Sequence, residues 1–484
     1  VEAAMSYTGD VSDPTRGPYT LDYYLELARE LSALNIHVLA IKDMAGLLKP
    51  AAATKLVGAL RAEFPDMPIH VHTHDTAGTG VASMLAAVHA GADAVDVATD
   101  AMSGMTSQPS MGAVVGALRG TPLDTGVDPR QITRINEYWE ETRAVYAPFE
   151  SGQKSGSADV YEHEMPGGQY TNLLYQSQQL GLAGRWPAIK KAYAAANRLL
   201  GDIVKVTPSS KVVGDLAQFM VTNDLTEEEV LERADSLSFP SSVVEYFQGY
   251  LGIPHHGFPE ALRAAVVRGK RLPNGKEMFH GRPGAELEPM DFDAVRDSLA
   301  ARYGSKIRNV DVVSYSQYPK VFEDFMRTRE MYDDLSVLDT RTFVEGLTVG
   351  QEVAVDIEQG KTLFIKLKTI GAPDESGNVE VTFVLNGQTR SVLVKDQHAA
   401  SDSKERPKAD PRLEGSIGSP MPGLVVDVNV KEGDVVKVGD SLVVLSAMKM
   451  ENNVGAPVSG KVEAVHVKSG DNVQAMDLLI EIST

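Results

Sequence analysis

The sequence predicts a multidomain protein: an α/β region, a helical region, a small antiparallel β domain and an all-β C-terminal domain. Three observations predict this order. Short apolar strands alternate with helices over the first ~120 residues, alternating strands with glycine turns occupy 342–395, and the last seventy residues contain an internal repeat. We place the domains at 1–124, 125–335, 336–395 and 413–484, with a linker at 396–412.

The first region is predicted to form a parallel sheet of βα units. Apolar strands begin near Val1, Ile36, Ile69 and Ala94, roughly 25–35 residues apart, which leaves room for a helix after each strand. The helices expected between them span 21–34, 50–64 and 80–90. A (β/α)₈ barrel builds its active site from residues that follow its strands, and polar residues follow these strands at Asp10, Lys42, Asp43, His72, His74 and Asp100. Four units make half of such a barrel, so either the other half is absent or the sheet is open.

The region 125–335 is mostly helical by pattern, as in 131–146 and 186–200. Thr226, followed three residues later by Glu229, resembles a capping box. Residues 396–411 are polar and lack periodicity, so we interpret them as a mobile linker.

Composition excludes several classes of protein. The net charge of −20 disfavours binding to nucleic acid or anionic lipid, both of which are polyanions. With no cysteine, the chain has neither disulfides nor thiolate metal sites, and a reducing compartment is expected. Since the chain opens in mid-strand on Val1 rather than on Met, we expect the true N-terminus to be absent. The bacterial cytoplasm is the expected location, with the mitochondrial matrix as an alternative.

The C-terminal repeat has an offset of 37 residues. It relates Pro420 to Pro457, Val430 to Val467, Asp434 to Asp471 and Asp440 to Asp477. The repeat predicts two four-stranded halves related by a pseudo-two-fold axis, a flattened barrel, with a protruding hairpin at 447–451 between them.

Lys449 lies at the tip of that hairpin, in Ala447-Met-Lys-Met-Glu451. Ala-Met-Lys-Met resembles the acceptor sequence of biotinyl carrier domains, in which a ligase joins biotin to the lysine amine. A plain exposed lysine is the ordinary interpretation of such a residue, but the tetrapeptide, the duplicated halves and the C-terminal position agree on the carrier. A lipoyl domain shares the duplicated fold, although its lysine usually follows Asp.

His72 and His74 are candidate metal ligands. They lie at i and i+2 on a strand and therefore point to one face, where two imidazoles are half of a divalent-metal site. A pair of structural core histidines is the alternative, and His70 is interpreted as structural because it lies deeper. Lys42 is predicted to point inward, where a lysine is costly unless it is paired or modified. Taken alone, Lys42 is better explained by a salt bridge, and Thr207 by capping of a turn or helix.

Five motifs resemble the carboxyltransferase domain of the pyruvate carboxylase family. They are Ile41-Lys-Asp-Met-Ala-Gly46, His72-Thr-His-Asp75, Gly104-Met-Thr-Ser-Gln-Pro109, Glu164-Met-Pro-Gly-Gly-Gln-Tyr170 and Lys205-Val-Thr-Pro-Ser-Ser-Lys211. The β domain and the Ala-Met-Lys-Met domain follow in that family's order, so the resemblance covers essentially the whole chain.

The resemblance implies carboxyl transfer from carboxybiotin on Lys449 to pyruvate, giving oxaloacetate. It implies that Lys42 carries an N-carboxyl group and binds Zn²⁺, Mn²⁺ or a related divalent metal together with His72 and His74. It further implies that Thr207 shuttles a proton between biotin and the pyruvate enolate. The implied partners are biotin protein ligase, further copies in a homotetramer, and an acyl-CoA activator that binds near the β domain at 342–395.

Parts of the family pattern are absent from this chain. The first four barrel strands, with a metal-ligand aspartate and a pyruvate-binding arginine, and the ATP-dependent biotin carboxylase region have no counterpart. The half barrel is then explained by truncation, and the 1–124 region would be strands 5–8. Two alternatives are the α-subunit of a biotin-dependent decarboxylase or transcarboxylase, and a carrier or assembly subunit without catalysis.

Overall fold

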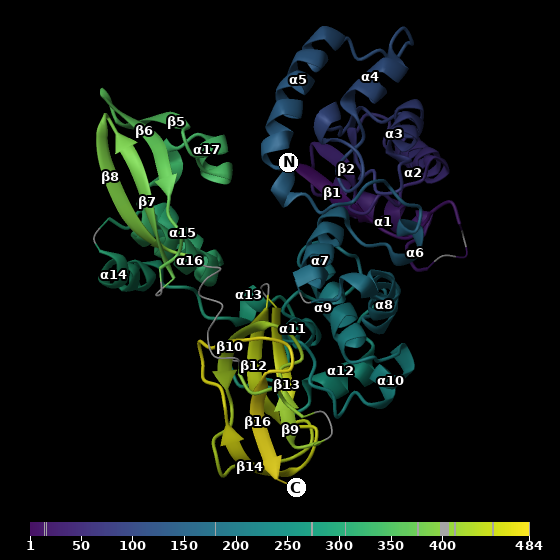
Figure 1. Cartoon of the computed structure of the whole chain (residues 1–484). Coiled ribbons are helices and arrows are strands. Elements are labelled where there is room, and N and C mark those ends of the chain that lie inside the picture. The colour runs from purple at the N-terminus through teal and green to yellow at the C-terminus, as the bar shows by residue number, and fades with distance from the viewer. Residues whose placement is uncertain are drawn as a thin grey trace. The chain divides into compact units, whose positions relative to one another are not determined.

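The computed structural model (Figure 1) describes the chain except for residues 14, 16, 180, 273, 305, 375–376, 397–405, 411–412, 448–449 and 484. It forms two compact units. Unit 1 comprises Val1–Arg143, Phe149–Glu286 and Arg406–Thr484, and unit 2 comprises Ala144–Pro148 and Leu287–Glu405. Among the described residues, no helix is both long and apolar enough to cross a membrane.

A four-stranded parallel sheet begins unit 1, as the alternation of strands and helices predicts. Its strands lie in the order β1 (Glu2–Tyr7), β2 (Val38–Asp43), β3 (Ile69–His72) and β4 (Ala94–Val95), all parallel. The helices that follow these strands are α1 (Leu21–Ser32), α2 (Pro50–Glu63), α3 (Gly80–His89) and α4 (Met111–Leu118). The mixed α/β class is therefore confirmed.

One face of this sheet is buried beneath helices. Leu39, Ile41, Ile69 and Val71 are at most 1% exposed and share a core with Leu56 of α2. Side chains alternate across a strand, so the intervening residues of β2 and β3 project from the opposite face.

The helical part of unit 1 has its own core, built mainly from α7, α8, α9, α11 and α12. Its helices are α5 (Pro129–Val145), α6 (Val160–His163), α7 (Gly167–Gln179), α8 (Trp186–Leu199), α9 (Ser209–Thr222), α10 (Glu227–Glu232), α11 (Ser241–Gln248), α12 (Glu260–Val267) and α13 (Pro283–Glu286). The predicted capping box is confirmed: Glu229 N–H donates to Thr226 Oγ1 at 3.2 Å, and Thr226 N–H donates to Glu229 Oε2 at 2.8 Å.

The C-terminal domain consists of two four-stranded sheets that repeat each other. Their orders are β13-β12-β10-β15 and β11-β14-β16-β9. The strands are β9 (Ser416–Gly418), β10 (Gly423–Val428), β11 (Val435–Val436), β12 (Ser441–Ala447), β13 (Met450–Gly455), β14 (Gly460–Val465), β15 (Asn472–Val473) and β16 (Leu478–Ser483). Advancing each strand of one sheet by 37 residues, or moving it back by as many, gives the other sheet.

The repeated aspartates explain why the repeat is visible in the sequence. Asp434 Oδ2 accepts the Lys431 N–H at 2.9 Å, and Asp471 Oδ2 accepts the Lys468 N–H at 3.0 Å. Asp440 and Asp477 each do the same for the amide three residues before them, at 2.8 and 2.7 Å. A carboxylate that accepts from its own turn fixes that turn, so each half needs the same residues.

The end of the expected linker differs from the prediction. Lys408 forms an ion pair with Asp477 at 2.7 Å, Arg406 pairs with Asp471 at 3.1 Å, and Ala409 is 6% exposed. The prediction of a mobile linker is therefore wrong for 406–410, because these polar residues are held to the C-terminal domain by ion pairs.

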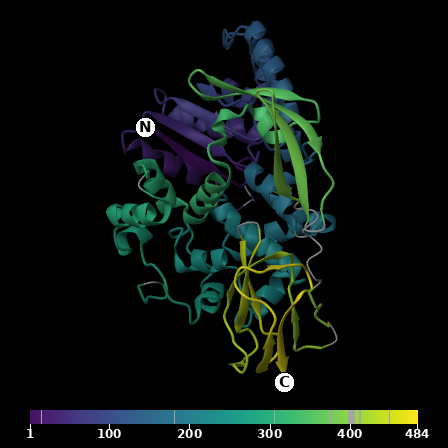
Figure 2. The ribbon, with the colours of Figure 1, turned by 60° about the vertical axis from the view of Figure 1, so that its left-hand side comes forward.

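Unit 2 combines four helices with an antiparallel sheet of order β5-β6-β7-β8 (Figure 2). Its elements are α14 (Phe292–Tyr303), α15 (Asn309–Gln317), α16 (Pro319–Tyr332), α17 (Thr340–Glu345), β5 (Glu352–Glu358), β6 (Lys361–Ile370), β7 (Asn378–Leu385) and β8 (Gln388–Lys395). Residues 287–335, expected with the helical region, instead cluster with this sheet. Within this segment Leu299, Val312 and Phe322 form a small core of their own, separate from the core of α7–α12.

Candidate functional site

The candidate site lies on the sheet face opposite α1–α3. The register pairs Ala40 with His70 and Lys42 with His72 across β2 and β3, so their side chains share this face. Lys42 therefore lies on the face of β2 that the sequence predicts, but its side chain is exposed rather than buried. Asp43, the next residue, is fully buried. The helices cover the face that carries Asp43, and they leave the face of Lys42 open.

The two candidate ligands His72 and His74 lie together. Their ring centroids are 5.3 Å apart with an interplanar angle of 79°. His72 Nδ1 lies 2.8 Å from Asp96 Oδ2, and His74 Nδ1 lies 2.6 Å from the carbonyl oxygen of Thr106. Both partners accept hydrogen bonds, so each Nδ1 carries a proton, and in the neutral imidazole Nε2 is then the atom with the free lone pair.

This arrangement fits a bound divalent metal. Metal-binding histidines almost always donate their second ring N–H to a carboxylate or a backbone carbonyl, which are the two partners seen here. No group of three or more His, Cys, Asp and Glu side chains in the described part of the chain could hold a metal. The histidine pair is therefore a partial ligand set, and Lys42, the register partner of His72, stands on the same face.

Burial and nearby polar groups shift the pKa of His74 and of its neighbour on β3, His70. Burial lowers the pKa of His74 and outweighs the hydrogen bond to the Thr106 carbonyl, which raises it, so the neutral imidazole that a metal needs is favoured. Burial also opposes protonation of His70, but hydrogen bonds to Asp96 and Glu2 outweigh it and raise its pKa. Both ring nitrogens of His70 lie within 2.8–2.9 Å of these two carboxylates, which is consistent with the predicted structural role.

Asp43 organises the turn after β2, a role that sequence reasoning missed. Its carboxylate accepts the amides of Ala45, Gly46, Leu47 and Leu48 at 2.8–3.3 Å and the Thr73 hydroxyl at 2.7 Å. Thr73 lies between the two histidines, so Asp43 joins the Lys42 strand to the His72-Thr-His74 segment. An aspartate directly after a strand and three residues before a glycine is the sequence signal that could have indicated this turn.

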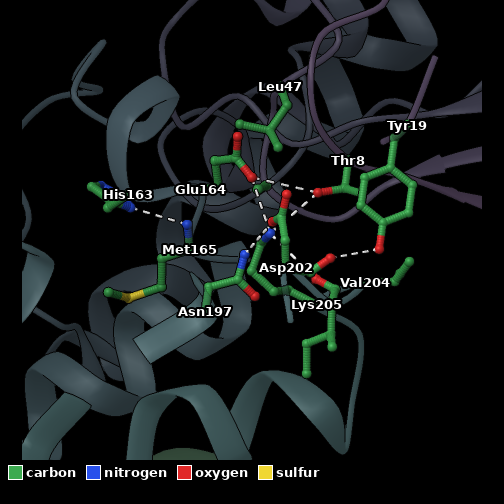
Figure 3. A network of polar contacts seen from close by, with 12 residues as sticks. Thr8, Tyr19, Leu47, His163, Glu164, Met165, Asn197, Asp202, Val204 and Lys205 are labelled. Carbon is green, nitrogen blue, oxygen red and sulfur yellow. Dashed lines mark hydrogen bonds and ion pairs between the residues drawn. The ribbon is translucent and has the colours of Figure 1, made fainter. Parts of the chain in front are cut away.

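Thr207 lies on a separate segment that precedes α9. Its side chain is exposed, and the segment is linked to the sheet through Lys205, whose Nζ lies 3.0 Å from Glu164 Oε2 and 3.2 Å from Thr8 Oγ1 (Figure 3). Thr8 directly follows β1. The motifs that contain Glu164 and Lys205 are visible in the sequence, but their contact is not, because 41 residues separate the two.

The predicted biotin acceptor, Lys449, lies outside the described residues. The strands on either side of it, β12 and β13, are paired as far as Ala447 and Met450. Only Met448 and Lys449 connect these paired residues, as the hairpin prediction requires.

Three parts of the chain match models of known protein families. Residues 1–138 match the HMGL-like family, 160–366 match a conserved carboxylase domain, and 415–482 match the biotin-requiring enzyme family. Over 452 residues, or 93% of this chain, it is 54% identical to pyruvate carboxylase 1 of Caenorhabditis elegans and 53% identical to the mitochondrial pyruvate carboxylase of Homo sapiens. The chain spans 38% of the length of each of these relatives.

Solved structures give the same result. The crystal structure of a complete multifunctional pyruvate carboxylase from Rhizobium etli matches with a TM-score of 0.74 and 46% identity, covering 99% of this chain and 44% of that one. The carboxyl transferase domain of the same enzyme with pyruvate and biocytin matches with a TM-score of 0.75 and 49% identity, covering 82% and 65%. The chain therefore belongs to the pyruvate carboxylase family, in which it corresponds to a C-terminal part with a biotin-carrier domain.

Proposed function

We propose that this chain carries out biotin-dependent transfer of a carboxyl group to pyruvate, giving oxaloacetate. One observation carries the proposal: the same chain contains a histidine pair whose Nδ1 atoms are both held by acceptors and a domain of the biotin-requiring type. The relative from Rhizobium etli whose carboxyl transferase domain was solved with pyruvate and biocytin supports both ligands.

The parallel sheet is, in this proposal, strands 5–8 of a (β/α)₈ barrel. The strands are all parallel and lie in chain order, and the candidate residues Lys42, His72 and His74 lie at or just beyond their carboxyl ends, where such barrels place their active sites. The remaining strands and the ATP-dependent biotin carboxylase region belong to the complete enzyme, which is consistent with the 38% share of the relatives' length.

Lys42, His72 and His74 would hold a divalent ion such as Zn²⁺ or Mn²⁺, with Lys42 carrying an N-carboxyl group. Carboxylation converts an exposed cation into an anionic oxygen ligand beside two neutral imidazoles. The ion, when bound, polarises the substrate and stabilises negative charge that develops near the enolate. Asp96 and the Thr106 carbonyl orient the two rings through their Nδ1–H groups.

Thr207 is the proposed general acid–base. A hydroxyl can donate and accept at the same oxygen, so it can move a proton between biotin and the enolate carbon of pyruvate without a net change of its own. Its exposure at the start of α9 leaves it accessible to both groups.

Lys449 is the proposed site of biotin attachment by biotin protein ligase. The neighbouring residue types, Met448 and Met450, would give apolar contacts at the two sites that the carrier visits. We further propose a homotetramer whose acyl-CoA activator binds near the β5–β8 sheet. The compartment is the bacterial cytoplasm or the mitochondrial matrix, and the name of the human relative places that protein in mitochondria.

Two measurements test the proposed function. An avidin blot should detect the chain when it is coexpressed with the ligase, should stay positive for Lys437→Arg, an exposed turn lysine of the same domain, and should be lost for Lys449→Arg. The biotinylated chain should then decarboxylate oxaloacetate once the upstream barrel half is added as a second polypeptide. Signal retained in Lys449→Arg would refute the acceptor. Inactivity of the complemented, biotinylated chain would refute the transferase.

A further inference from the structure

A buried cation links the sheet to the segment that carries Thr207. Lys205 is 2% exposed, and its ammonium has three acceptors: Glu164 Oε2 at 3.0 Å, Thr8 Oγ1 at 3.2 Å and the Ile203 carbonyl at 3.5 Å (Figure 3). An ammonium group has three N–H donors, so these contacts use all of them. The Glu164 side chain is 17% exposed, which makes the ion pair a largely desolvated one.

The backbone around Glu164 is itself constrained. Glu164 has a φ of +52°, a left-handed conformation that is uncommon for a residue other than glycine. Its N–H donates to the Val160 carbonyl at 2.7 Å, and the next amide, of Met165, donates to His163 Nδ1 at 3.0 Å. Strained conformations of this kind persist where surrounding contacts determine them, and they cluster at functional sites.

The segment 202–209 is fixed on both sides of Lys205. Asp202 accepts the Asn197 amide at its carboxylate and the Tyr19 hydroxyl at its carbonyl, both at 2.7 Å. At the other end, the Ser209 hydroxyl donates to the Val204 or Val206 carbonyl, each at 2.6 Å, and accepts the Val206 N–H at 3.0 Å. Thr207 thus projects from a short loop with anchors before and after it.

Stability alone does not explain this pair. Desolvating two charges costs about as much as their attraction returns, so buried ion pairs are poor stabilisers compared with apolar residues of equal volume. What the pair does specify is position. Thr8, at the end of β1, donates to Glu164 Oε2 at 3.5 Å and accepts from Lys205 at 3.2 Å, so the three side chains together fix the residue two places before Thr207 against the end of β1. β1 neighbours β2, whose register partner β3 ends at His72.

We propose that Lys205 and Glu164 are positioning residues that hold the Thr207 hydroxyl in register with the sheet edge carrying Lys42, His72 and His74. The inference rests on the proposed function, since it assigns the pair to the placement of that reaction's proton-transfer group. Neither residue touches substrate; each acts through the loop.

The test compares variants of the chain complemented with the upstream barrel half, assayed by oxaloacetate decarboxylation. Lys205→Met and Glu164→Gln should lower kcat about 10- to 100-fold, the effect of a displacement near 1 Å, with KM and metal content within about twofold of the parent. Lys205→Arg should recover part of the loss. The double variant Lys205→Met/Glu164→Gln leaves neither charge buried alone and keeps the test valid should a single variant fail to fold.

Lys190→Met is the matched control. It removes another partly buried ion pair, with Asp159, that lies outside the Thr207 segment, and kcat should remain near the parent value. If Lys205→Met folds, or the double variant does, and its kcat is within twofold of the parent value, the inference is overturned. It is equally overturned when Lys190→Met, at equal loss of thermal stability, loses as much kcat as Lys205→Met.

Amide exchange on the 484-residue chain separates this inference from the proposed function. Lys205→Met should accelerate exchange across 203–209, and Lys190→Met should not. A complemented parent without activity refutes the proposed function, while the exchange result still decides the role of the ion pair. Unchanged exchange at 203–209 would overturn that role.

Discussion

Replacing Asp43 with Asn removes one oxygen and the charge from a buried carboxylate with five donors around it. Asp43 Oδ1 accepts three backbone amides at 3.0–3.3 Å, and Oδ2 accepts the Leu48 N–H at 2.8 Å and the Thr73 hydroxyl at 2.7 Å. In the variant, with Oδ1 retained, an NH₂ group takes the place of Oδ2. The Thr73 hydroxyl can rotate and accept a hydrogen bond from this NH₂ group. The Leu48 N–H can only donate, so it loses its acceptor.

The cost follows from these contacts. A buried N–H left without an acceptor costs about 1–3 kcal/mol. The three remaining amides lose a charged acceptor, and charge-assisted hydrogen bonds are about twice as strong as neutral ones, which adds roughly 1–2 kcal/mol. The turn should therefore lose about 2–5 kcal/mol of local stability. Because each 1.4 kcal/mol is about a factor of ten, amides 45–48 should exchange at least ~30-fold faster.

Hydrogen exchange with peptide-level mass spectrometry on the full chain measures this change. Asp66→Asn makes the same substitution at an exposed turn position and should leave exchange at 45–48 unaltered. A change below about threefold in Asp43→Asn would show that the carboxylate does not hold the turn. Acceleration spread equally over α8 and α9 would show instead that the substitution unfolds unit 1 globally.

Two further predictions concern histidines. Burial lowers the pKa of His163 to about 4. Between pH ~6.5 and ~4 the unfolded chain therefore binds a proton that the folded chain does not. The free energy of unfolding should be highest above pH ~6.5 and should fall by on the order of 3 kcal/mol toward pH ~4. Exchange of residues 160–167 against pH should show this slope and His163→Asn should flatten it, whereas equal slopes would contradict the assignment. Asp96→Asn, which removes the carboxylate partner of His72 Nδ1, should weaken binding of Zn²⁺ or Mn²⁺ in the complemented barrel about 10- to 100-fold in a metal titration, and unchanged affinity would remove Asp96 from the site.

Local signals accounted for most of the fold. α2 begins at the predicted Pro50, α8 at the predicted Trp186 and α10 after the predicted Thr226 cap, because proline and capping residues act within one turn of the chain. The division between the units was not foreseen. It depends on which core Leu299 and Phe322 join, and an amphipathic helix does not specify its partner.

The candidate site was predictable where its residues are close in sequence. The spacing of His72 and His74 predicted two residues of one strand; β3 ends at His72, so His74 lies just beyond the strand, and the structure still brings their rings together. The Nδ1 partners Asp96 and Thr106 come from distant segments, so no spacing rule could find them. The Lys205–Glu164 contact is of the same kind, since it depends on the packing of two loops around β1 rather than on any pattern within one.

The duplicated domain has a consequence for where modification can occur. Each half, at about 37 residues, is below the size that usually folds alone, so the covalent joint supplies the high effective concentration that brings the halves together. β12 ends the first half and β13 begins the second, and the proposed acceptor Lys449 falls between them. The aspartate turns at 431–434 and 437–440 each have an equivalent turn 37 residues later, but the connection between the two halves occurs once. An acceptor lysine in that connection therefore has no symmetry-equivalent position that the ligase could modify instead.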